Sequence, residues 1–153
     1  NLKGAFLCSQ AAVRHMVARK QGVIINISSV GAFAAQQAAA AYCASKAAIR
    51  VYGEGLRGAL APTGIKVNVI CPGFVKSRIT DANDFPMPFF MQADKAARKI
   101  ARGLERNRGM IAFPWQMNII IGLLKMTPQW LMDLVANRVP RKASAPDQNA
   151  TGD

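Results

Sequence analysis

The stretch Gly22-Val23-Ile24-Ile25-Asn26-Ile27-Ser28-Ser29 indicates the fold more clearly than any other part of the sequence. It is short, β-branched and nearly all apolar until it ends in two hydroxyl residues. Such a run predicts a strand that is covered on both faces, as in a parallel sheet. A second apolar run, Ile65 to Ile70, stops at Pro72-Gly73 and predicts another buried strand.

Segments with helical character flank these two runs. Apolar residues in 2–18 recur near helical spacing, and the Ala-rich segment 38–61 leads to a stop near Pro62-Thr63-Gly64. A basic amphipathic helix is expected over 93–107, and a short strand over 109–113. The succession of helix, strand, helix and strand predicts an α/β fold with a doubly wound parallel sheet.

The chain reads as one domain over 1–137, with its core elements in 1–113. Its 153 residues and 51% hydrophobic content are sufficient for a buried core. The apolar, irregular segments 74–92 and 114–137 are interpreted as a substrate lid or a subunit contact. Residues 138–153, without periodicity, are expected to form a disordered basic tail.

The cysteines indicate the redox setting of the protein, and the first residues indicate whether the sequence is part of a longer one. Cys8, Cys43 and Cys71 are odd in number and form no CxxC pair, so neither a disulfide framework nor a zinc site is expected. The acidic residues are scattered, so no metal site is expected either. A reduced, cytoplasmic setting is the simplest interpretation. Because Asn1 is not an initiator methionine and no leader opens the chain, its first residues are interpreted as the interior of a longer protein.

The net charge of +12 raises nucleic acid and anionic membranes as partners. The basic residues are spread along the chain without interleaved aromatic residues, which favours a solvated basic surface over a nucleic-acid site. The run Ile119 to Leu124, with Trp115 and Trp130 nearby, keeps a peripheral membrane or interaction module as an alternative function. That run is too short to span a bilayer.

A tyrosine and a lysine carry the predicted chemistry. Tyr42 and Lys46 are four residues apart in the segment Tyr42-Cys43-Ala44-Ser45-Lys46, so they share one face of the predicted helix. A nearby ammonium favours the phenolate, which suits the tyrosine to exchange a proton with an alcohol or a ketone. Ser29, with Ser28 as its competitor, follows a buried strand, at the sheet end where open α/β folds bind ligands.

These segments resemble motifs of the short-chain dehydrogenase/reductase family. The chain contains counterparts of its N-x-x-G, I-S-S, Y-x-x-S-K and P-G motifs in order, and the resemblance extends from Asn1 to about Phe113. It implies the C-terminal half of a doubly wound, single-domain Rossmann fold, since no Gly-rich turn joins a strand to a helix here. Gly53-Glu54-Gly55-Leu56-Arg57-Gly58 spells G-x-G-x-x-G inside the predicted helix, and we attribute its glycines to close helix packing.

The resemblance also implies roles and partners. It makes Tyr42 the general acid/base, with Lys46 activating it and binding the nicotinamide ribose, while Ser29 contacts the substrate oxygen and Asn1 holds a relay water. It implies NAD or NADP as cofactor and a homodimer or homotetramer through the helices at 2–18 and 38–61. The apolar residues near the predicted site, among them Phe74 and Phe85, favour an apolar alcohol or ketone as substrate. An epimerase or dehydratase using the same Tyr/Lys pair is the related alternative, and the isolated chain is expected to be inactive. The implied cofactor contacts are Tyr42, Lys46, Pro72, Gly73, Val75 and Ser77; the expected substrate contacts are Ser29, Phe33, Phe74 and Phe85.

Overall fold

The computed structural model describes residues 1–34, 39–81 and 86–128, apart from the side chains of residues 79, 124 and 125. Helices and strands alternate along most of this part of the chain, as the sequence predicts. In order, the elements are α1 (Leu2–Arg19), β1 (Gly22–Ile27), the 3-10 turn η1 (Val30–Ala32), α2 (Ala40–Leu60), the 3-10 turn η3 (Ala61–Thr63), β2 (Ile65–Pro72), α3 (Arg78–Asp81), α4 (Ala93–Glu105), β3 (Met110–Phe113) and α5 (Trp115–Lys125).

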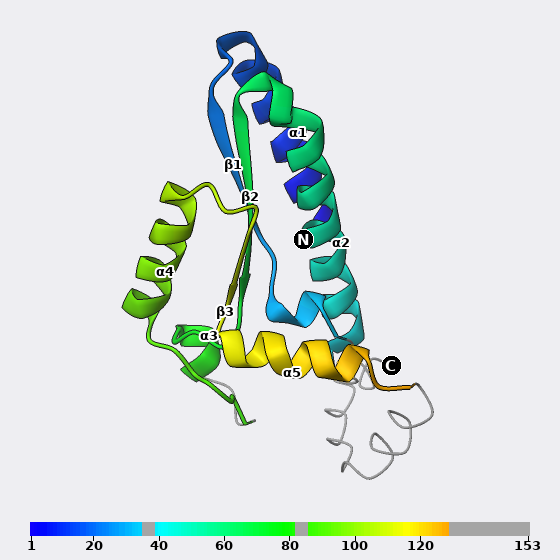
Figure 1. Ribbon diagram of the computed structural model, residues 1–153, viewed down its shortest axis with the longest axis vertical. Helices are drawn as coiled ribbons and strands as arrows, with labels where there is room; N and C mark the ends of the chain where they lie inside the picture. Colours follow the sequence, from blue (N-terminus) through cyan, green and yellow to red (C-terminus); the bar gives the residue numbers. More distant parts are fainter. Residues whose placement is uncertain (35–38, 82–85, 129–153) are drawn as a thin grey trace, which may run out of the picture.

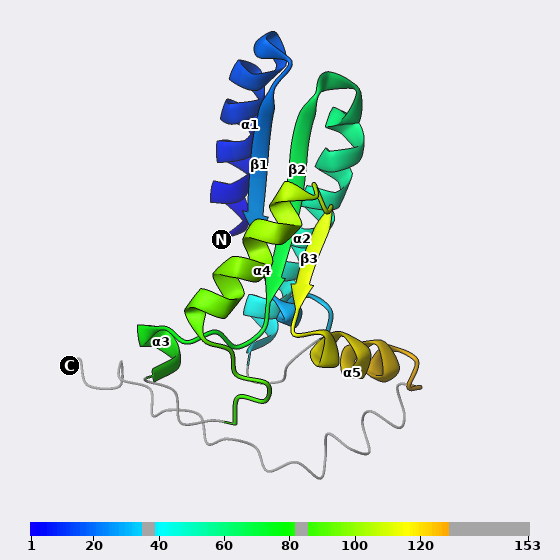
Figure 2. The same ribbon diagram turned by 60° about the vertical axis from the view of Figure 1, so that its left-hand side comes forward.

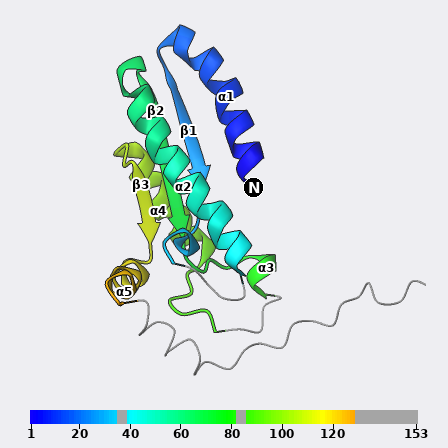
Figure 3. The same cartoon turned by 90° about the vertical axis from the view of Figure 1, so that its right-hand side faces the viewer.

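The strands form one parallel sheet in the order β1-β2-β3. The register pairs Gly22 with Ile65 at the start of β1, and Pro72 with Phe113 at the end of β3. All three strands therefore end at the same edge of the sheet, toward which their arrows point in Figures 1 and 3. The predicted α/β fold with a parallel sheet is confirmed.

Opposite faces of β2 pack against different helices, because successive side chains of a strand alternate in direction. Ile65 and Val67 join a core cluster with Ile24 and Leu60, against which Met16 of α1 packs. Ile70 joins a second cluster on the other face. The second cluster contains Ile70, Met91, Ala96, Ile111 and Phe113, with Ile100 and Leu104 of α4 packed against it.

One face of β1 differs from the sequence prediction. Ile24 and Asn26 are buried, but Val23, Ile25 and Ile27 are 49%, 43% and 51% exposed. Among the described residues, α1 and α2 contact β1, whereas α4 contacts β2 and β3. The prediction that both faces of β1 are covered is therefore wrong for this chain, because α4 does not extend over it.

The two segments interpreted as lids contain helices that the irregular sequence pattern did not predict. Residues 74–92 include the short helix α3, and residues 114–137 begin with α5. The predicted tail, 138–153, lies outside the described residues. Among the described helices, none is long and apolar enough to cross a membrane.

The G-x-G-x-x-G run lies within α2, as predicted, but only its first glycine is in close contact. A Cβ atom on Gly53 would lie 2.5 Å from Val69 Cγ2 on β2. No atom lies within 4 Å of the corresponding position at Gly55 or Gly58. Close packing therefore explains Gly53 alone.

Candidate active site

A cavity of about 670 Å³ lies at the carboxyl ends of the strands. Ser29 follows β1, Pro72-Gly73 ends β2, and Phe113 ends β3, so each strand contributes to its wall. Tyr42 enters from the first turn of α2. The full lining is Ser29, Val30, Gly31, Ala39, Tyr42, Pro72, Gly73, Phe74, Val75, Ser77, Thr80, Ala93, Ala96, Ala97, Ile100 and Phe113.

The sequence therefore brings most of the predicted site residues to one place. Tyr42 is 46% exposed within the described structure, which leaves its ring accessible from the cavity. The turn η1 lies against it, since a Cβ on Gly31 would be 3.6 Å from Tyr42 Cε1. This is an ordinary van der Waals distance, so the backbone after β1 packs beside the tyrosine ring.

The two adjacent serines have different surroundings. Ser28 is 3% exposed, and its hydroxyl donates a 2.7 Å hydrogen bond to the backbone oxygen of Lys46. Ser29 lines the cavity, and its Oγ accepts a 3.1 Å hydrogen bond from the Gly31 N–H. No hydrogen bond donated by the Ser29 hydroxyl is found among the described residues, so its proton is available to a ligand. Of the two hydroxyls, Ser29 is thus the one able to donate into the cavity.

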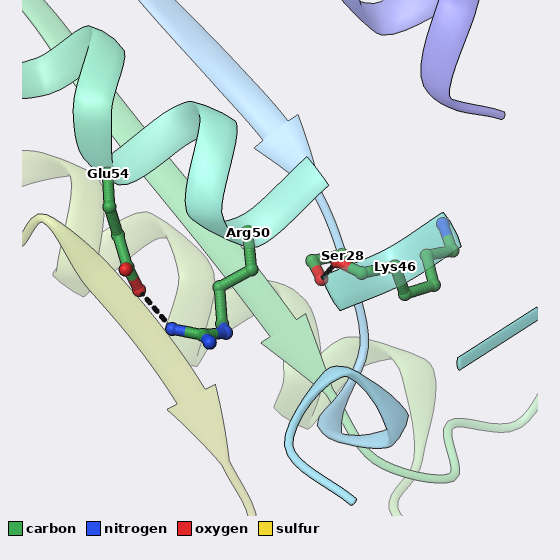
Figure 4. A network of polar contacts seen from close by, with 4 residues as sticks. All are labelled: Ser28, Lys46, Arg50 and Glu54. Carbon is green, nitrogen blue, oxygen red and sulfur yellow. Dashed lines mark hydrogen bonds and ion pairs between the residues drawn. The ribbon is translucent and has the colours of Figure 1, made fainter. Parts of the chain in front are cut away.

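Lys46 extends away from Ser28, as Figure 4 shows, and does not line the cavity. Its Nζ donates a 3.0 Å hydrogen bond to the backbone oxygen of Ile27 and lies 5.8 Å from the centre of the Tyr42 ring. Asn1 and Lys46 instead line a neighbouring hollow of about 340 Å³ between α1, β1 and α2. Asn1 Nδ2 is 3.5 Å from Ser45 Oγ, one residue before Lys46.

The segment after β2 is held by backbone hydrogen bonds. The Gly73 N–H donates to the Phe113 oxygen at 2.7 Å. Further along, the Lys76 N–H donates to the Met91 oxygen and the Met91 N–H donates to the Phe74 oxygen, both at 2.9 Å. These bonds keep Pro72, Gly73, Val75 and Ser77, the predicted cofactor contacts, along one wall of the cavity.

The three phenylalanines predicted as substrate contacts have different positions. Phe74 lines the cavity. Phe33 does not line it, and its ring lies 5.0 Å from the Arg50 guanidinium carbon. Phe85 lies outside the described residues.

Sequence reasoning missed the wall that α4 provides. Ala93, Ala96, Ala97 and Ile100 recur at helical spacing and line the cavity opposite the basic side chains of the same helix. The sequence shows this apolar stripe, but it does not show that the stripe faces the cavity at the strand ends. Thr80 was also missed; its hydroxyl accepts from the Ser77 N–H at 2.7 Å and holds the turn into α3.

The Cys71 thiol near the end of β2 also bears on the chemistry of the site. Burial raises the pKa of the Cys71 thiol above its usual value, an effect partly offset by a hydrogen bond with Ser28. Such a thiol stays protonated and is a poor nucleophile. All three cysteines are free, and the described part of the chain contains no cluster of three or more His, Cys, Asp or Glu residues positioned to hold a metal ion.

Comparisons with known proteins agree with this geometry. The family model "short chain dehydrogenase" matches residues 1–85. A protein of Myxococcus xanthus described as "Uncharacterized oxidoreductase" is 39% identical over 139 residues, covering 91% of this chain and 55% of its own. The 3-oxoacyl-[acyl-carrier-protein] reductase FabG of Rickettsia prowazekii is 42% identical over 81 residues, covering 53% of this chain and 34% of its own.

Among solved structures, a short-chain dehydrogenase from Sphingobium yanoikuyae in complex with NADPH matches with a TM-score of 0.71 and 26% identity. The match covers 96% of this chain and 57% of that one. The chain thus spans about half the length of relatives that it matches along most of its own sequence. With more than half of its residues matched by the family model, the chain belongs to the short chain dehydrogenase family.

Proposed function

We propose that this chain provides the proton-transfer and substrate-binding part of an NAD(P)-dependent oxidoreductase that interconverts an apolar alcohol and a ketone. The observation that carries the proposal is that Tyr42 and Ser29 line one cavity together with Pro72-Gly73. The family membership, the M. xanthus oxidoreductase and the NADPH bound by the S. yanoikuyae enzyme support it.

The residues fit the nicotinamide end of such a cofactor. The cavity has Tyr42 and Ser29 on one side and the Pro72-to-Ser77 segment on another, with room for more than a substrate alone. When bound, the cofactor supplies or accepts the hydride. The described residues contain no Gly-rich turn that joins a strand to a helix, so we propose that this chain alone is inactive and that NAD or NADP is held in part by other sequence.

Proton transfer is assigned to Tyr42. In ketone reduction its hydroxyl donates a proton to the substrate oxygen, and in alcohol oxidation it takes that proton back. Ser29 donates a hydrogen bond to the same oxygen and stabilises its developing negative charge. Lys46 places a positive charge 5.8 Å from the centre of the Tyr42 ring, on the same helix. Asn1, close to Ser45 in the adjoining hollow, is proposed to hold a water that connects Lys46 to solvent.

An apolar substrate is proposed from the cavity wall. Phe74, Phe113 and, from α4, Ala93, Ala96, Ala97 and Ile100 give the cavity an apolar wall. Such a wall offers few hydrogen bonds to a polar substrate and favours an apolar one. The segment 74–92 is proposed to act as the lid over this wall.

Self-association is proposed through α1 and α2. Both helices expose large apolar side chains, including Phe6 and Leu7 on α1 and Val51 on α2, at 45%, 48% and 56% of their surface. Phe6 and Tyr52 already contact each other across the two helices, with ring centres 5.5 Å apart. An apolar surface built from two packed helices is suited to a homodimer or homotetramer contact.

The experiment is a coenzyme-oxidation assay of the full-length protein with NADH or NADPH and a panel of apolar and polar ketones. The proposal predicts coenzyme-dependent reduction of at least one apolar ketone, with the alcohol as product. Product formed without net coenzyme oxidation would favour an epimerase or dehydratase. Failure to bind either coenzyme, together with no turnover on any ketone, would contradict the proposal.

A further inference from the structure

Two hydroxyl side chains line the cavity just beyond β2, and they are hydrogen-bonded to each other's residues. Ser77 is a predicted coenzyme contact, whereas Thr80, three residues later, has no part in the function proposed above. Figure 2 shows the helix α3, which contains Thr80, beyond the end of β2. The hydrogen bonds of this pair indicate what Thr80 contributes to the site.

The Thr80 hydroxyl bonds to the backbone of the turn before it. Its Oγ1 accepts a 2.7 Å hydrogen bond from the Ser77 N–H. The same oxygen lies 2.8 Å from the Ser77 backbone oxygen and 3.2 Å from the Val75 backbone oxygen. Carbonyl oxygens only accept, so the single Thr80 proton is donated to the backbone. One side-chain atom therefore connects α3 to the backbone on which Ser77 is carried.

The Ser77 hydroxyl, in contrast, retains a proton for a ligand. The Thr80 N–H donates to Ser77 Oγ at 3.3 Å, so this oxygen accepts within the turn. The two hydroxyl oxygens are 3.4 Å apart, which is longer than an ordinary O–H···O bond. No other partner for the Ser77 proton is found among the described residues, so an acceptor in the cavity can take it.

The side-chain bonds of Thr80 are separate from those that hold the rest of the segment. Val75 pairs with Met91 in an isolated bridge, which anchors the chain before Ser77. The Asp81 N–H donates to the Ser77 oxygen at 3.0 Å, which is a backbone bond of α3. Neither contact uses the hydroxyl at position 80. Removing that hydroxyl therefore leaves the anchors on both sides in place and frees the Ser77 N–H.

We propose that Thr80 is a positioning residue for the coenzyme, a role that rests on the oxidoreductase function proposed above. Its hydroxyl holds the Ser77 backbone in the orientation in which the Ser77 side chain donates a hydrogen bond into the cavity, to an acceptor at the nicotinamide end of NAD(P). Thr80 acts through Ser77, because its own proton is donated to the backbone.

The test measures coenzyme dissociation constants of the full-length protein by titration calorimetry, with NADH and NADPH. Thr80→Val keeps the branched side chain without the hydroxyl, and it is expected to raise Kd for the bound coenzyme by about tenfold. The apparent KM for coenzyme should rise similarly, with a smaller change in kcat at saturating coenzyme. Thr80→Ser keeps the hydroxyl and should restore Kd to within about twofold of the wild type.

A matched control is available at the end of η3. Thr63 Oγ1 donates a 2.7 Å hydrogen bond to the Leu60 oxygen, three residues earlier, as Thr80 does to Ser77, but Thr63 does not line the cavity. Thr63→Val should therefore leave Kd unchanged. Any loss of affinity that follows from removing a threonine hydroxyl in general would appear in this control as well.

A double-mutant cycle shows whether Thr80 acts through Ser77. Ser77→Ala alone should also raise Kd, because it removes the donor itself. Adding Thr80→Val to Ser77→Ala should then change Kd by less than about twofold, since residues that act as one unit are not additive.

The outcomes separate this role from the proposed function. A wild-type protein that binds neither coenzyme would contradict the oxidoreductase function, and the role of Thr80 with it. Coenzyme binding by the wild type that is unchanged in Thr80→Val would overturn the role of Thr80 alone. Losses that add in the double variant would show that Thr80 does not act through Ser77. Circular dichroism verifies folding, and Thr80→Ala takes the place of Thr80→Val in the same comparison if the valine variant does not fold.

Discussion

The Ser28 hydroxyl donates a 2.7 Å hydrogen bond to the backbone oxygen of Lys46, and Lys46 Nζ donates a 3.0 Å bond to the backbone oxygen of Ile27. The end of β1 and the first turns of α2 are therefore joined by bonds in both directions. This connection fixes Tyr42, one helical turn before Lys46, beside the loop that carries Ser29.

Substitution of Ser28 is expected to affect mainly stability, whereas substitution of Ser29 is expected to affect mainly turnover. Ser28→Ala removes a buried hydrogen bond and should lower the free energy of unfolding by about 1 kcal/mol, with turnover largely retained. Ser29→Ala should lower kcat by at least about tenfold with a smaller effect on stability, because its hydroxyl faces the cavity. Urea unfolding and steady-state kinetics of both variants check this. The reverse pattern would assign the substrate contact to Ser28.

Gly53 and Gly55 provide a matched pair in α2. Gly53→Ala should destabilise the protein by about 1–3 kcal/mol, because the new methyl would lie 2.5 Å from the buried Val69 side chain. Gly55→Ala meets no atom within 4 Å and should stabilise the helix by about 0.5–1 kcal/mol. Thermal unfolding of both variants measures the difference. Equal effects of the two substitutions would show that Gly53 is not closely packed.

Cavity size is expected to depend on one face of α4. Ala97 lines the cavity, and Ala101 on the same helix is exposed and does not. Ala97→Phe should raise KM for bulky ketones more than for small ones, because the new ring occupies substrate space. Ala101→Phe serves as the control and should leave KM for both unchanged. A uniform effect of Ala97→Phe on large and small substrates would place substrate binding elsewhere.

The buried thiol of Cys71 predicts a pH dependence of stability. Burial raises its folded-state pKa above the unfolded value, so its contribution is fully present below the unfolded pKa and is lost as the pH rises through the folded one. Between about pH 7 and about pH 10, the wild-type protein should lose more unfolding free energy than Cys71→Ala does. Urea unfolding across this range measures the difference. Identical pH profiles would show that the Cys71 thiol is not preferentially protonated in the folded state.

The sequence predicted the sheet and most of the cavity because these depend on local pattern. Two β-branched runs ending in hydroxyl or Pro-Gly residues led to the correct strands, and the carboxyl ends of parallel strands meet at one edge. The spacing of Tyr42 and Lys46 correctly placed both on α2. The position of Ser29 at the end of β1 was enough to bring it to the same cavity as Tyr42.

Other features depend on contacts that spacing does not reveal. A shared helix face does not set the direction of a lysine side chain. Lys46 turns toward β1, an edge strand of the described sheet, and donates a hydrogen bond to the backbone oxygen of Ile27. The Phe33 ring packs against the guanidinium group of Arg50, which comes from a later turn of α2, and the sequence pattern does not reveal this contact. Helix α5 was missed because its run, Ile119 to Leu124, is apolar on all sides and shows no helical period.

The most direct test of the central claim compares Tyr42→Phe with Tyr52→Phe in the full-length protein. Both tyrosines lie in α2, and each substitution removes one hydroxyl while keeping the ring, but Tyr52 contacts Phe6 and does not line the cavity. With saturating coenzyme and binding verified separately, Tyr42→Phe should lower kcat by about 10²- to 10⁴-fold and Tyr52→Phe should leave it near the wild-type value. Wild-type turnover in Tyr42→Phe, with coenzyme bound, would contradict the assignment of proton transfer to Tyr42.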